Sequence, residues 1–436
     1  MSGSLTPAAD RLARFQEAYR NLDLLPLIEK RELEKFQVAY GLDLLAELQQ
    51  LVEDDDSKDG KIIFSGHRGC GKSTLLAEFG RQCRDRGYFV VFFSIADSIE
   101  MSDVDHVSIL FAIALNLMLE AEKASVSIPK SAKTAIDNWF AKKARIITET
   151  PLSAEVSVGF ELFKLISGKL KSEASVRDEI RKEFEKKISE LVAQINIIAA
   201  QIQAATQQDV LVIIDDLDKL DLAVVEEIYK KHIKALFLPG IRIIFTIPIS
   251  ALRETSLRSY ITTESDNQIV EMPVTKTFVK GERRKDDPVP VAEAMQTLCE
   301  VLHRRIDPEL LDPEIAAQIV FYSGGVLREL IRLTNVCCRI CLRSLRRNPD
   351  QSALAIDPIV LAEAVKELRL DFEMQLGKVD YEILQTTYEK FLPDDPKDQK
   401  FLDLLHGLHV LEYRNDEIWY DAHPIVIDLL KRKGLI

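Results

Sequence analysis

Residues 66–74 read Gly-His-Arg-Gly-Cys-Gly-Lys-Ser-Thr and fit the pattern G-x-x-x-x-G-K-[ST] of a phosphate-binding loop. An apolar run precedes the motif at 61–65 and an amphipathic run follows at 74–79, which predicts a strand, a loop and a helix in succession. Glycines let such a loop curl so that backbone N–H groups point at a polyphosphate, and the helix N-terminus adds its positive dipole. Glycine is scarce, at 17 of 436 residues, which argues against a chance match.

The side chains of this loop predict how a polyphosphate would be held. Lys72 is expected to reach the β- and γ-phosphates, and the hydroxyl of Ser73 is expected to hold Mg²⁺. The residues expected to line the phosphates are Gly66, Arg68, Gly69, Cys70, Gly71, Lys72, Ser73 and Thr74.

An acidic pair, Asp215 and Asp216, ends a second apolar run at 210–214. A carboxylate at the tip of a strand beside the phosphate loop can bind the Mg²⁺ shell, and Asp215 is in that position. The neighbouring carboxylate of Asp216 could orient or deprotonate the attacking water. An Asp-Asp pair after a strand is also a common way to open a loop, so this interpretation depends on the upstream motif.

Alternation of apolar runs with helical stretches predicts a doubly wound, parallel α/β sheet. The expected strands are 61–65, 88–95, 210–214, 241–247 and 268–272. The expected divisions are a helical segment at 1–55, a core at 56–280, an all-helical lid at 281–370 and a winged-helix domain at 371–436. A β-hairpin at 407–415 and 417–420 is the reason for the last prediction.

A helical insertion at 97–209 interrupts the core, and it is long for a simple crossover. We expect a helix near 104–120, a short alternating segment at 154–162 and one long charged helix from about 175 to 205. Residues 159–171 mix apolar and basic side chains, which favours a packed hairpin or a partner-docking element over a membrane surface.

Composition narrows the class of protein. Charged residues make up 29% and hydrophobic residues 47%, as in ordinary globular proteins. Residues 1–10 do not resemble a signal peptide, and no run approaches the roughly 20 apolar residues of a membrane span. The six cysteines form no paired framework, which predicts reduced thiols in the cytoplasm, and the C-x-x-C at 338–341 is expected to be a packed helix face.

Taken with the first two motifs, the strand that ends at Thr246 and the stretch Ser-Gly-Gly-Val-Leu-Arg-Glu-Leu at 323–330 make the chain resemble AAA+ P-loop ATPases. The resemblance is to the branch that holds STAND-type ATPases and origin-recognition-like initiators, and it covers roughly residues 35–435. It implies ATP and Mg²⁺ as cofactors. It also implies that Thr246 is the sensor-1 group facing the γ-phosphate, and that Arg328 is the sensor-2 arginine of the lid.

Two further expectations follow from this resemblance. Assemblies of this kind complete the site with an arginine from a neighbouring subunit, and Arg253 and Arg258 are the candidates here. Most AAA+ enzymes have Asp-Glu where this chain has Asp215 and Asp216. The shorter second side chain predicts slow turnover.

The sequence therefore predicts an ATP-hydrolysing, self-associating switch that controls a separate effector protein, as in defence or signalling assemblies. The alternative is a DNA-associated initiator or a transposition-type loader, and a third possibility is a scaffold locked by nucleotide. The arginine-rich helix at 328–347 could contact DNA phosphates or an acidic partner. Residues 371–436 have fourteen acidic and eight basic side chains, a net charge of −6, which favours protein contact over DNA reading.

Overall fold

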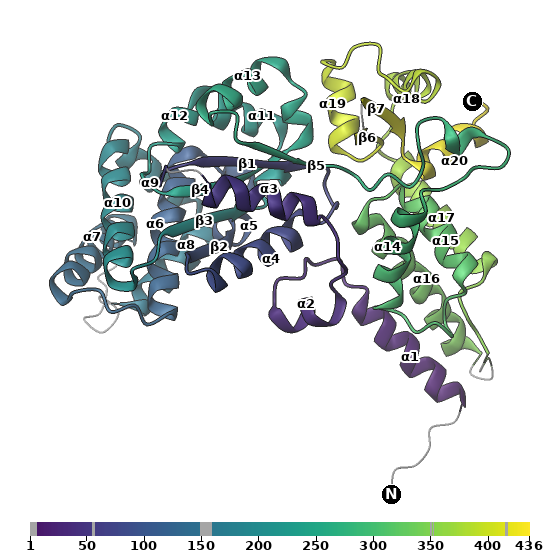
Figure 1. Cartoon of the computed structure of the whole chain (residues 1–436), viewed down its shortest axis with the longest axis horizontal. Helices are drawn as coiled ribbons and strands as arrows, with labels where there is room; N and C mark the ends of the chain where they lie inside the picture. The colour runs from purple at the N-terminus through teal and green to yellow at the C-terminus, as the bar shows by residue number, and fades with distance from the viewer. Residues whose placement is uncertain (1–6, 55–56, 149–158, 349–350, 352, 415–416) are drawn as a thin grey trace, which may run out of the picture. The chain divides into compact units, whose positions relative to one another are not determined.

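The computed structural model (Figure 1) describes residues 7–54, 57–148, 159–348, 351, 353–414 and 417–436. The chain forms two compact units. One unit combines residues 1–42, the loop at 66–74 and residues 272–436, and the other combines 43–65 with 75–271. The phosphate-loop motif thus groups with the C-terminal part of the chain, and the acidic pair with the sheet.

The five predicted strands form one sheet in the order β2-β3-β4-β1-β5, and β3 pairs in parallel with both of its neighbours. This confirms the parallel α/β prediction. The acidic turn after β3 and the phosphate loop after β1 follow strands that are not neighbours in the sheet, because β4 lies between β3 and β1. The strands are β1 (Lys61–Gly66), β2 (Phe89–Ser94), β3 (Val210–Asp215), β4 (Arg242–Pro248) and β5 (Ile269–Met272).

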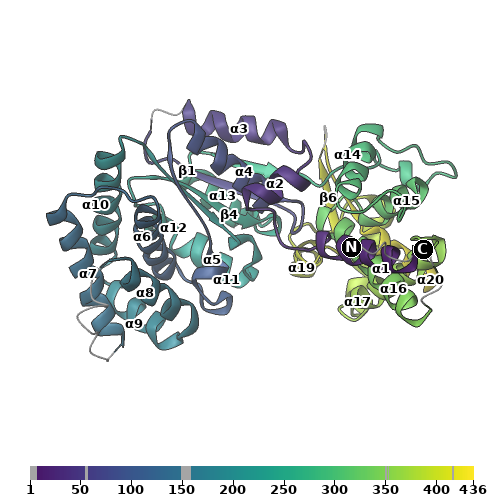
Figure 2. The same cartoon turned by 90° about the horizontal axis from the view of Figure 1, so that it is seen from below.

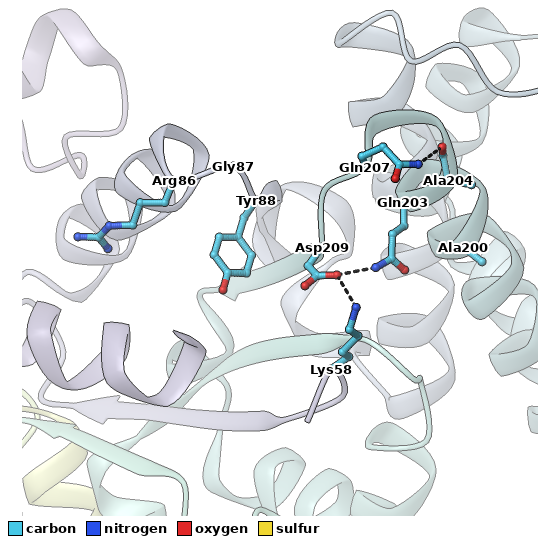
Figure 3. A pocket seen from close by; sticks show the side chains of 9 residues that line it. All are labelled: Lys58, Arg86, Gly87, Tyr88, Ala200, Gln203, Ala204, Gln207 and Asp209. Atoms are coloured by element: carbon cyan, nitrogen blue, oxygen red, sulfur yellow. Dashed lines mark hydrogen bonds and ion pairs between the residues drawn. The ribbon is translucent and has the colours of Figure 1, made fainter. Parts of the chain in front are cut away.

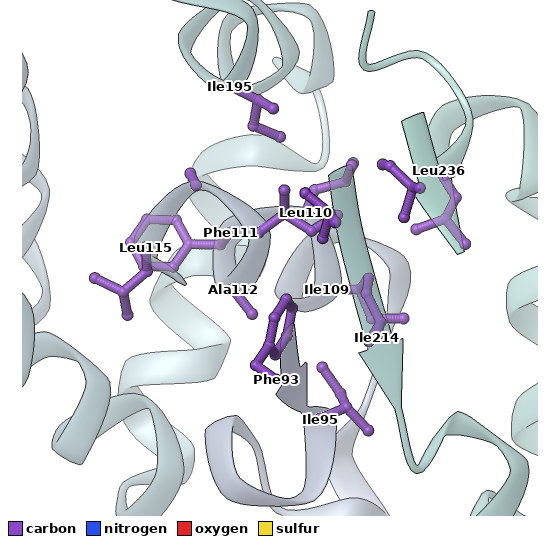
Figure 4. Close-up of a cluster of buried hydrophobic side chains, with 14 of the residues drawn as sticks. Phe93, Ile95, Ile109, Leu110, Phe111, Ala112, Leu115, Ile195, Ile214 and Leu236 are labelled. Carbon is purple, nitrogen blue, oxygen red and sulfur yellow. The ribbon is translucent and has the colours of Figure 1, made fainter. Parts of the chain in front are cut away.

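Helix α6 (His106–Lys123) supplies most of the core beside the sheet. Its residues from Val107 to Leu115 are buried without a break, as expected of a helix covered on every side. Figure 4 shows Ile109, Leu110 and Phe111 of this helix around the strand residues Phe93 and Ile214. Asp105 caps the helix by accepting from the N–H groups of Val107 and Ser108, at 2.8 and 3.0 Å.

The other helices of the insertion gather with α6 at one side of the sheet (Figures 1 and 2). They are α7 (Lys130–Thr148), α8 (Phe160–Ser172), α9 (Ala174–Phe184) and α10 (Ile188–Thr206). The predicted hairpin at 159–171 is wrong, since this stretch forms α8 and buries Leu162, Phe163, Ile166 and Leu170 in the core. That apolar face is therefore covered by protein. Most of the alternating segment at 154–162 lies outside the described residues.

The single long helix predicted at 175–205 is also wrong, because the chain breaks between α9 and α10 at residues 185–187. These residues are Glu, Lys and Lys, so this turn has no apolar side chain to bury. Lys187 leaves the helical conformation with φ −132° and ψ 34°. The two halves can then bury separate apolar faces, Ile180 and Phe184 on one and Ile195 and Ile198 on the other.

Short helices and turns connect the strands. They are α3 (Leu42–Glu53), α4 (Lys72–Asp85), α5 (Ile95–Ser98), α11 (Leu222–Glu226), α12 (Ile233–Leu236), α13 (Thr255–Glu264), the π-helix Glu227–Lys231 and the 3₁₀ turns Met101–Asp103, Leu217–Lys219, Ile249–Leu252 and Glu282–Arg284. Among the described helices, none combines the length and the apolarity that crossing a bilayer demands.

The C-terminal unit is built on α16 (Leu327–Arg347), whose apolar face is buried. Cys337, Cys338 and Cys341 lie on that face, and all six cysteines, each within the described residues, are free thiols. The packed-face prediction is thus confirmed. Around α16 lie α1 (Pro7–Asn21), α14 (Ala292–His303), α15 (Pro313–Ser323) and α17 (Pro358–Glu373). The same unit also holds α2 (Lys30–Phe36).

The predicted hairpin near the C-terminus is confirmed as the antiparallel pair β6 (Val410–Arg414) and β7 (Ile418–Ala422). The tip residues Asn415 and Asp416 lie outside the described residues. Tyr413 stacks on Trp419 at 4.5 Å, and both rings pack with Val326 at the start of α16. Helices α18 (Lys378–Lys390), α19 (Gln399–His406) and α20 (Pro424–Arg432) accompany the hairpin.

Candidate nucleotide site

The phosphate-loop motif has the backbone that its glycines predict. Gly69 has φ +83°, in the left-handed region, and α4 begins at Lys72 and runs for 14 residues. A Cβ on Gly69 would lie 2.6 Å from the Cβ of Arg328, so this glycine also lets the start of α16 approach the loop. Arg68 is exposed and Cys70 is buried. Loop curvature and a helix N-terminus are what a polyphosphate requires.

Lys72 is folded back onto the loop that it belongs to. Its Nζ donates to the carbonyl oxygens of Gly66 at 2.9 Å and of His67 at 2.7 Å, and the residue is buried. Ser73 and Thr74 are half-buried, and the hydroxyl of Thr74 accepts from the N–H of Leu27 at 3.0 Å. The predicted phosphate-binding lysine thus lies at the loop, with its ammonium held by two main-chain carbonyls.

His67 is a site residue that sequence reasoning missed. Its Nε2 accepts from the backbone N–H of Glu412 in β6 at 2.8 Å, and both residues are buried. Position 67 is a variable position of the motif, so the motif gave no reason to choose it. The one available signal was the residue type, because an imidazole can accept a hydrogen bond there.

Arg328 lies at the loop, as the sensor-2 prediction requires. Its backbone N–H donates to the carbonyl oxygen of Gly69 at 2.9 Å. Its side chain is half-buried, and no described carboxylate forms an ion pair with its guanidinium. A cation in this position is suited to a phosphate.

The second set of predicted residues is the acidic turn after β3. One carboxylate oxygen from each of Asp215, Asp216 and Asp218 lies within 4.8 Å of the others, and all three residues are buried. Carboxylate oxygens are ligands that Mg²⁺ prefers. The sequence predicted Asp215 as a metal ligand and gave no such role to Asp218, although the spacing Asp-Asp-Leu-Asp is visible.

Asp216 already has two partners in this turn. Ser94 of β2 donates to its Oδ2 at 2.7 Å, and the ammonium of Lys219 lies 2.5 Å from its Oδ1. Its backbone is left-handed, with φ +68°, which is unusual for a residue other than glycine and marks a tightly determined turn. The carboxylate of the predicted base is thus held by a hydroxyl and an ammonium.

The hydroxyl of Thr246 has two hydrogen-bond partners that the sequence did not predict. Its hydroxyl accepts from the N–H of Leu217 at 3.0 Å and donates to the carbonyl of Ile214 at 3.2 Å, and the side chain is fully buried. Thr246 therefore bonds to the residues on both sides of the acidic pair. The polar group expected to face a γ-phosphate thus also holds the turn that bears the carboxylates.

The two arginines proposed to act in a neighbouring subunit share one carboxylate. Arg253 lies 2.7 Å and Arg258 3.2 Å from the carboxylate oxygens of Glu271. The side chain of Arg253 is only 8% exposed, whereas that of Arg258 is 42% exposed. This placement disfavours Arg253 as a group reaching another molecule and leaves Arg258 as the candidate. Arg253 also follows a 3₁₀ turn and does not lie on α13.

The arginine-rich face of α16 is matched by acids of α17. Arg332 pairs with Asp371 at 2.5 Å, Arg339 pairs with Glu367, and Arg343 lies 3.8 Å from Glu363. In the terminal module, Lys433 pairs with Glu373 at 2.6 Å and Arg432 with Asp428 at 3.0 Å. Three of the six arginines of α16 are thus paired within the unit, whereas Arg346 and Arg347 are exposed.

A polar groove lies at the opposite edge of the sheet, where β2 and β3 begin (Figure 3). Asp209 accepts there from Lys58 at 3.2 Å and pairs with Gln203, and Tyr88 and Arg86 complete the wall. Ligands of parallel sheets bind beyond the carboxyl ends of the strands, so this groove is not the nucleotide site.

A family model described as AAA ATPase domain matches residues 43–230, which include β1, the phosphate loop and the acidic turn. The protein is an ATPase. The matched region ends before β4, so it does not extend to Thr246, the two arginines of Glu271 or the lid.

The chain is also similar to two solved structures of archaeal proteins, each at 12% identity. Cdc6p of Pyrobaculum aerophilum aligns over 95% of this chain and 98% of its own, with a TM-score of 0.42. The ORC2 protein of Aeropyrum pernix, in ADPNP and ADP complexes, aligns over 96% and 98%, with a TM-score of 0.40. The comparison with curated proteins found no match. At these values the likeness carries no conclusion about function.

Proposed function

We propose that the protein is an ATP-dependent conformational switch in which the lid responds to the nucleotide bound at the phosphate loop. The observation that carries this proposal is the contact between Arg328 and Gly69. The residue whose guanidinium pairs with no carboxylate in the described part of the chain is joined through its backbone to the loop. A phosphate that engages the guanidinium would therefore bias the position of α16.

The nucleotide would be held by residues that fit it. The amides of the loop and the start of α4 suit the phosphates, Lys72 would reach the β- and γ-phosphates, and Ser73 would hold Mg²⁺. Asp215 would complete the metal shell, with Asp218 next to it. Mg²⁺ would neutralise charge on the phosphates, and the carboxylates of this turn would orient its shell.

Slow turnover is part of the proposal. Asp216 is the residue expected to orient water, and its two carboxylate oxygens already bond to Ser94 and Lys219. A carboxylate whose oxygens already bond to a hydroxyl and an ammonium is less available to orient or deprotonate a water. This arrangement supports a timer more than a motor.

The charge of the C-terminal part of the chain bears on the partner. Ion pairs neutralise much of α16 and α20, and the terminal module is acidic, which supports contact with protein. We therefore retain ATP-dependent self-association and control of a separate effector protein in the cytoplasm, with the C-terminal hairpin and helices acting as a winged-helix module. The STAND branch is part of the same proposal.

The second candidate is a DNA-associated initiator or loader. The two similar solved structures carry the names Cdc6p and ORC2, and in this chain the exposed Arg346 and Arg347 are the observation that favours DNA. This candidate predicts ATP-dependent DNA binding that weakens steeply with salt. Gel shift at two salt concentrations separates the candidates, because an effector switch would show no such binding.

The test of the main proposal is chromatography of the protein with ATP, with ADP and without nucleotide, alongside calorimetry. We expect ATP binding and an assembly that forms only with ATP. Lys72→Ala should abolish both, while Lys182→Ala, on an exposed face of α9, should leave both unchanged. Absence of ATP binding by the wild-type protein would overturn the proposal. If the wild-type protein binds ATP, an assay of phosphate release separates the two remaining possibilities: slow release indicates a timer, and no release indicates a nucleotide-locked scaffold.

A further inference from the structure

We infer that His67 is a latch that ties the phosphate loop to the β6–β7 hairpin and opposes nucleotide binding. This inference deepens the proposed function and rests on it, since it names the residue through which nucleotide would reach the C-terminal module. It follows from four contacts, all of them within one compact unit.

The first contact fixes the chemistry of the ring. A backbone N–H can only donate, so the Nε2 of His67 accepts from Glu412 across 2.8 Å and carries no proton. The ring is therefore neutral, with its proton on Nδ1. His67 is 1% and Glu412 2% exposed, so water does not compete for this bond.

The second and third contacts show that the hairpin holds more than one segment. The hydroxyl of Tyr413, next to Glu412, donates to the carbonyl of Gly324 at 2.8 Å in the turn before α16. Arg328, the second residue of α16, donates its backbone N–H to the carbonyl oxygen of Gly69 in the loop. The hairpin, the start of α16 and the phosphate loop are thus joined pairwise in a closed set, and each contact restrains the other two.

The fourth contact decides whether nucleotide binding strengthens or weakens the latch. The carbonyl oxygen of His67 accepts from the ammonium of Lys72 at 2.7 Å, so one residue holds the hairpin by its ring and the lysine by its backbone. A triphosphate that takes the ammonium of Lys72 withdraws it from His67. Because a ligand stabilises the state in which its partners are available, phosphate binding and the latched loop oppose one another.

The sheet geometry offers a way to break the latch from either side. Glu412 pairs with Tyr420 of β7, and the N–H of Tyr420 donates to Phe391 outside the hairpin. Glu412 and Tyr420 therefore direct their N–H groups away from each other, as in a non-hydrogen-bonded pair. Proline at position 412 would remove the donor without removing a bond between the two strands.

The experiment compares wild-type protein with His67→Phe, which keeps a ring and removes the acceptor, and with Glu412→Pro. Calorimetry measures ATP affinity, and hydrogen exchange follows residues 410–414 with and without ATP. We expect ATP to bind about 3- to 10-fold more tightly to both variants, as the loss of one hydrogen bond implies. Exchange at 410–414 should rise with ATP in the wild type and be fast throughout in the variants.

His67→Gln, whose amide oxygen can accept from Glu412, should restore part of the wild-type behaviour. His303→Phe, an exposed histidine of α14, should behave as wild type. Unchanged or weaker ATP affinity in both latch variants, or exchange at 410–414 that ignores ATP in the wild type, would overturn the inference. Failure of the wild type to bind ATP would instead overturn the proposed function.

Discussion

The hydroxyl of Thr246 on β4 accepts a hydrogen bond from the N–H of Leu217 across 3.0 Å. The same hydroxyl donates to Ile214, so a single side chain spans the two carboxylates that lie between these residues. This relationship makes Thr246 a positioning residue for Asp215 and Asp216. It also separates two roles that a sequence motif cannot distinguish, namely touching a phosphate and holding the residues that bind a metal.

We predict that Thr246→Val lowers the free energy of unfolding by about 1–3 kcal/mol, because the buried N–H of Leu217 is left without its acceptor. ATP hydrolysis should fall with it as the acidic turn shifts. Thr246→Ser keeps the hydroxyl and should retain most of both. Urea unfolding and phosphate release measure the two effects. A valine variant of unchanged stability but lost hydrolysis would speak for direct contact with the nucleotide.

The acidic turn predicts a dependence on Mg²⁺. Chelation should abolish hydrolysis, and added Mg²⁺ should restore it. Asp215→Asn should weaken Mg²⁺ binding to the nucleotide complex by one order of magnitude or more, and Asp218→Asn should do so by about 10-fold if it supports the metal shell. ADP binding without Mg²⁺ should stay unchanged in both variants. Equal Mg²⁺ affinity in wild type and Asp218→Asn would remove Asp218 from the site.

The buried carboxylate of Glu271 predicts different outcomes for its two arginines. Arg253→Met leaves a buried charge with one partner fewer and should cost about 3 kcal/mol of stability. Arg258→Met should cost less than about 1 kcal/mol, since that side chain is partly exposed. If Arg258 acts in a neighbouring subunit, its variant should lose hydrolysis while keeping ATP affinity. Thermal unfolding and phosphate release check both variants.

The sheet and the site motifs could be predicted because their signals are local. Continuous apolar runs predict strands covered on both faces, and a glycine-rich loop between a strand and a helix predicts the phosphate loop. The hairpin of β6 and β7 followed from alternation and turn residues alone. The break between α9 and α10 could not be predicted, because it depends on which faces the neighbouring helices cover.

The partners of polar side chains could not be predicted for the same reason. Thr246, Arg253 and Arg332 all have residue types that suit a phosphate, and each has a partner elsewhere in the sequence. His67 shows the reverse case, since a variable position of a motif contacts a strand 345 residues away. A spacing pattern shows which chemical groups the chain carries. It does not show which other residues those groups contact in the fold.

The ion pairs between α16 and α17 predict a set of substitutions that would create DNA binding. The combined substitutions Glu363→Gln, Glu367→Gln and Asp371→Asn free Arg339 and Arg343 and leave Arg332 with Glu329 alone, so they should raise non-specific DNA affinity. The slope of log affinity against log salt should steepen by up to about three, one for each new phosphate contact. Glu314→Gln, Glu382→Gln and Glu389→Gln change the net charge equally on other helices and should have little effect. Equal binding by the two triple variants would mean that net charge alone decides.

His423 predicts acid sensitivity of the C-terminal module. Burial, with Arg283 nearby, lowers the pKa of this histidine to about 3, and its Nδ1 accepts from Ile425 at 3.3 Å to cap α20. Because the unfolded chain binds a proton near pH 6.5 and the folded chain does not, stability is full above that pH and falls as the pH drops toward 3. From pH 7 to pH 5 the loss from this one group is about 2 kcal/mol.

The neighbouring His409, whose pKa burial also lowers, adds to the same slope. His423→Asn keeps a good capping side chain and cannot be protonated in this range, so its stability should fall less steeply than that of the wild type between pH 7 and pH 5, with His409 still contributing. His303→Asn, on an exposed surface, should keep the wild-type slope. Urea midpoints at pH 7, 6 and 5 measure these slopes. An equally steep slope in His423→Asn would mean that other groups carry the acid response, His409 first among them.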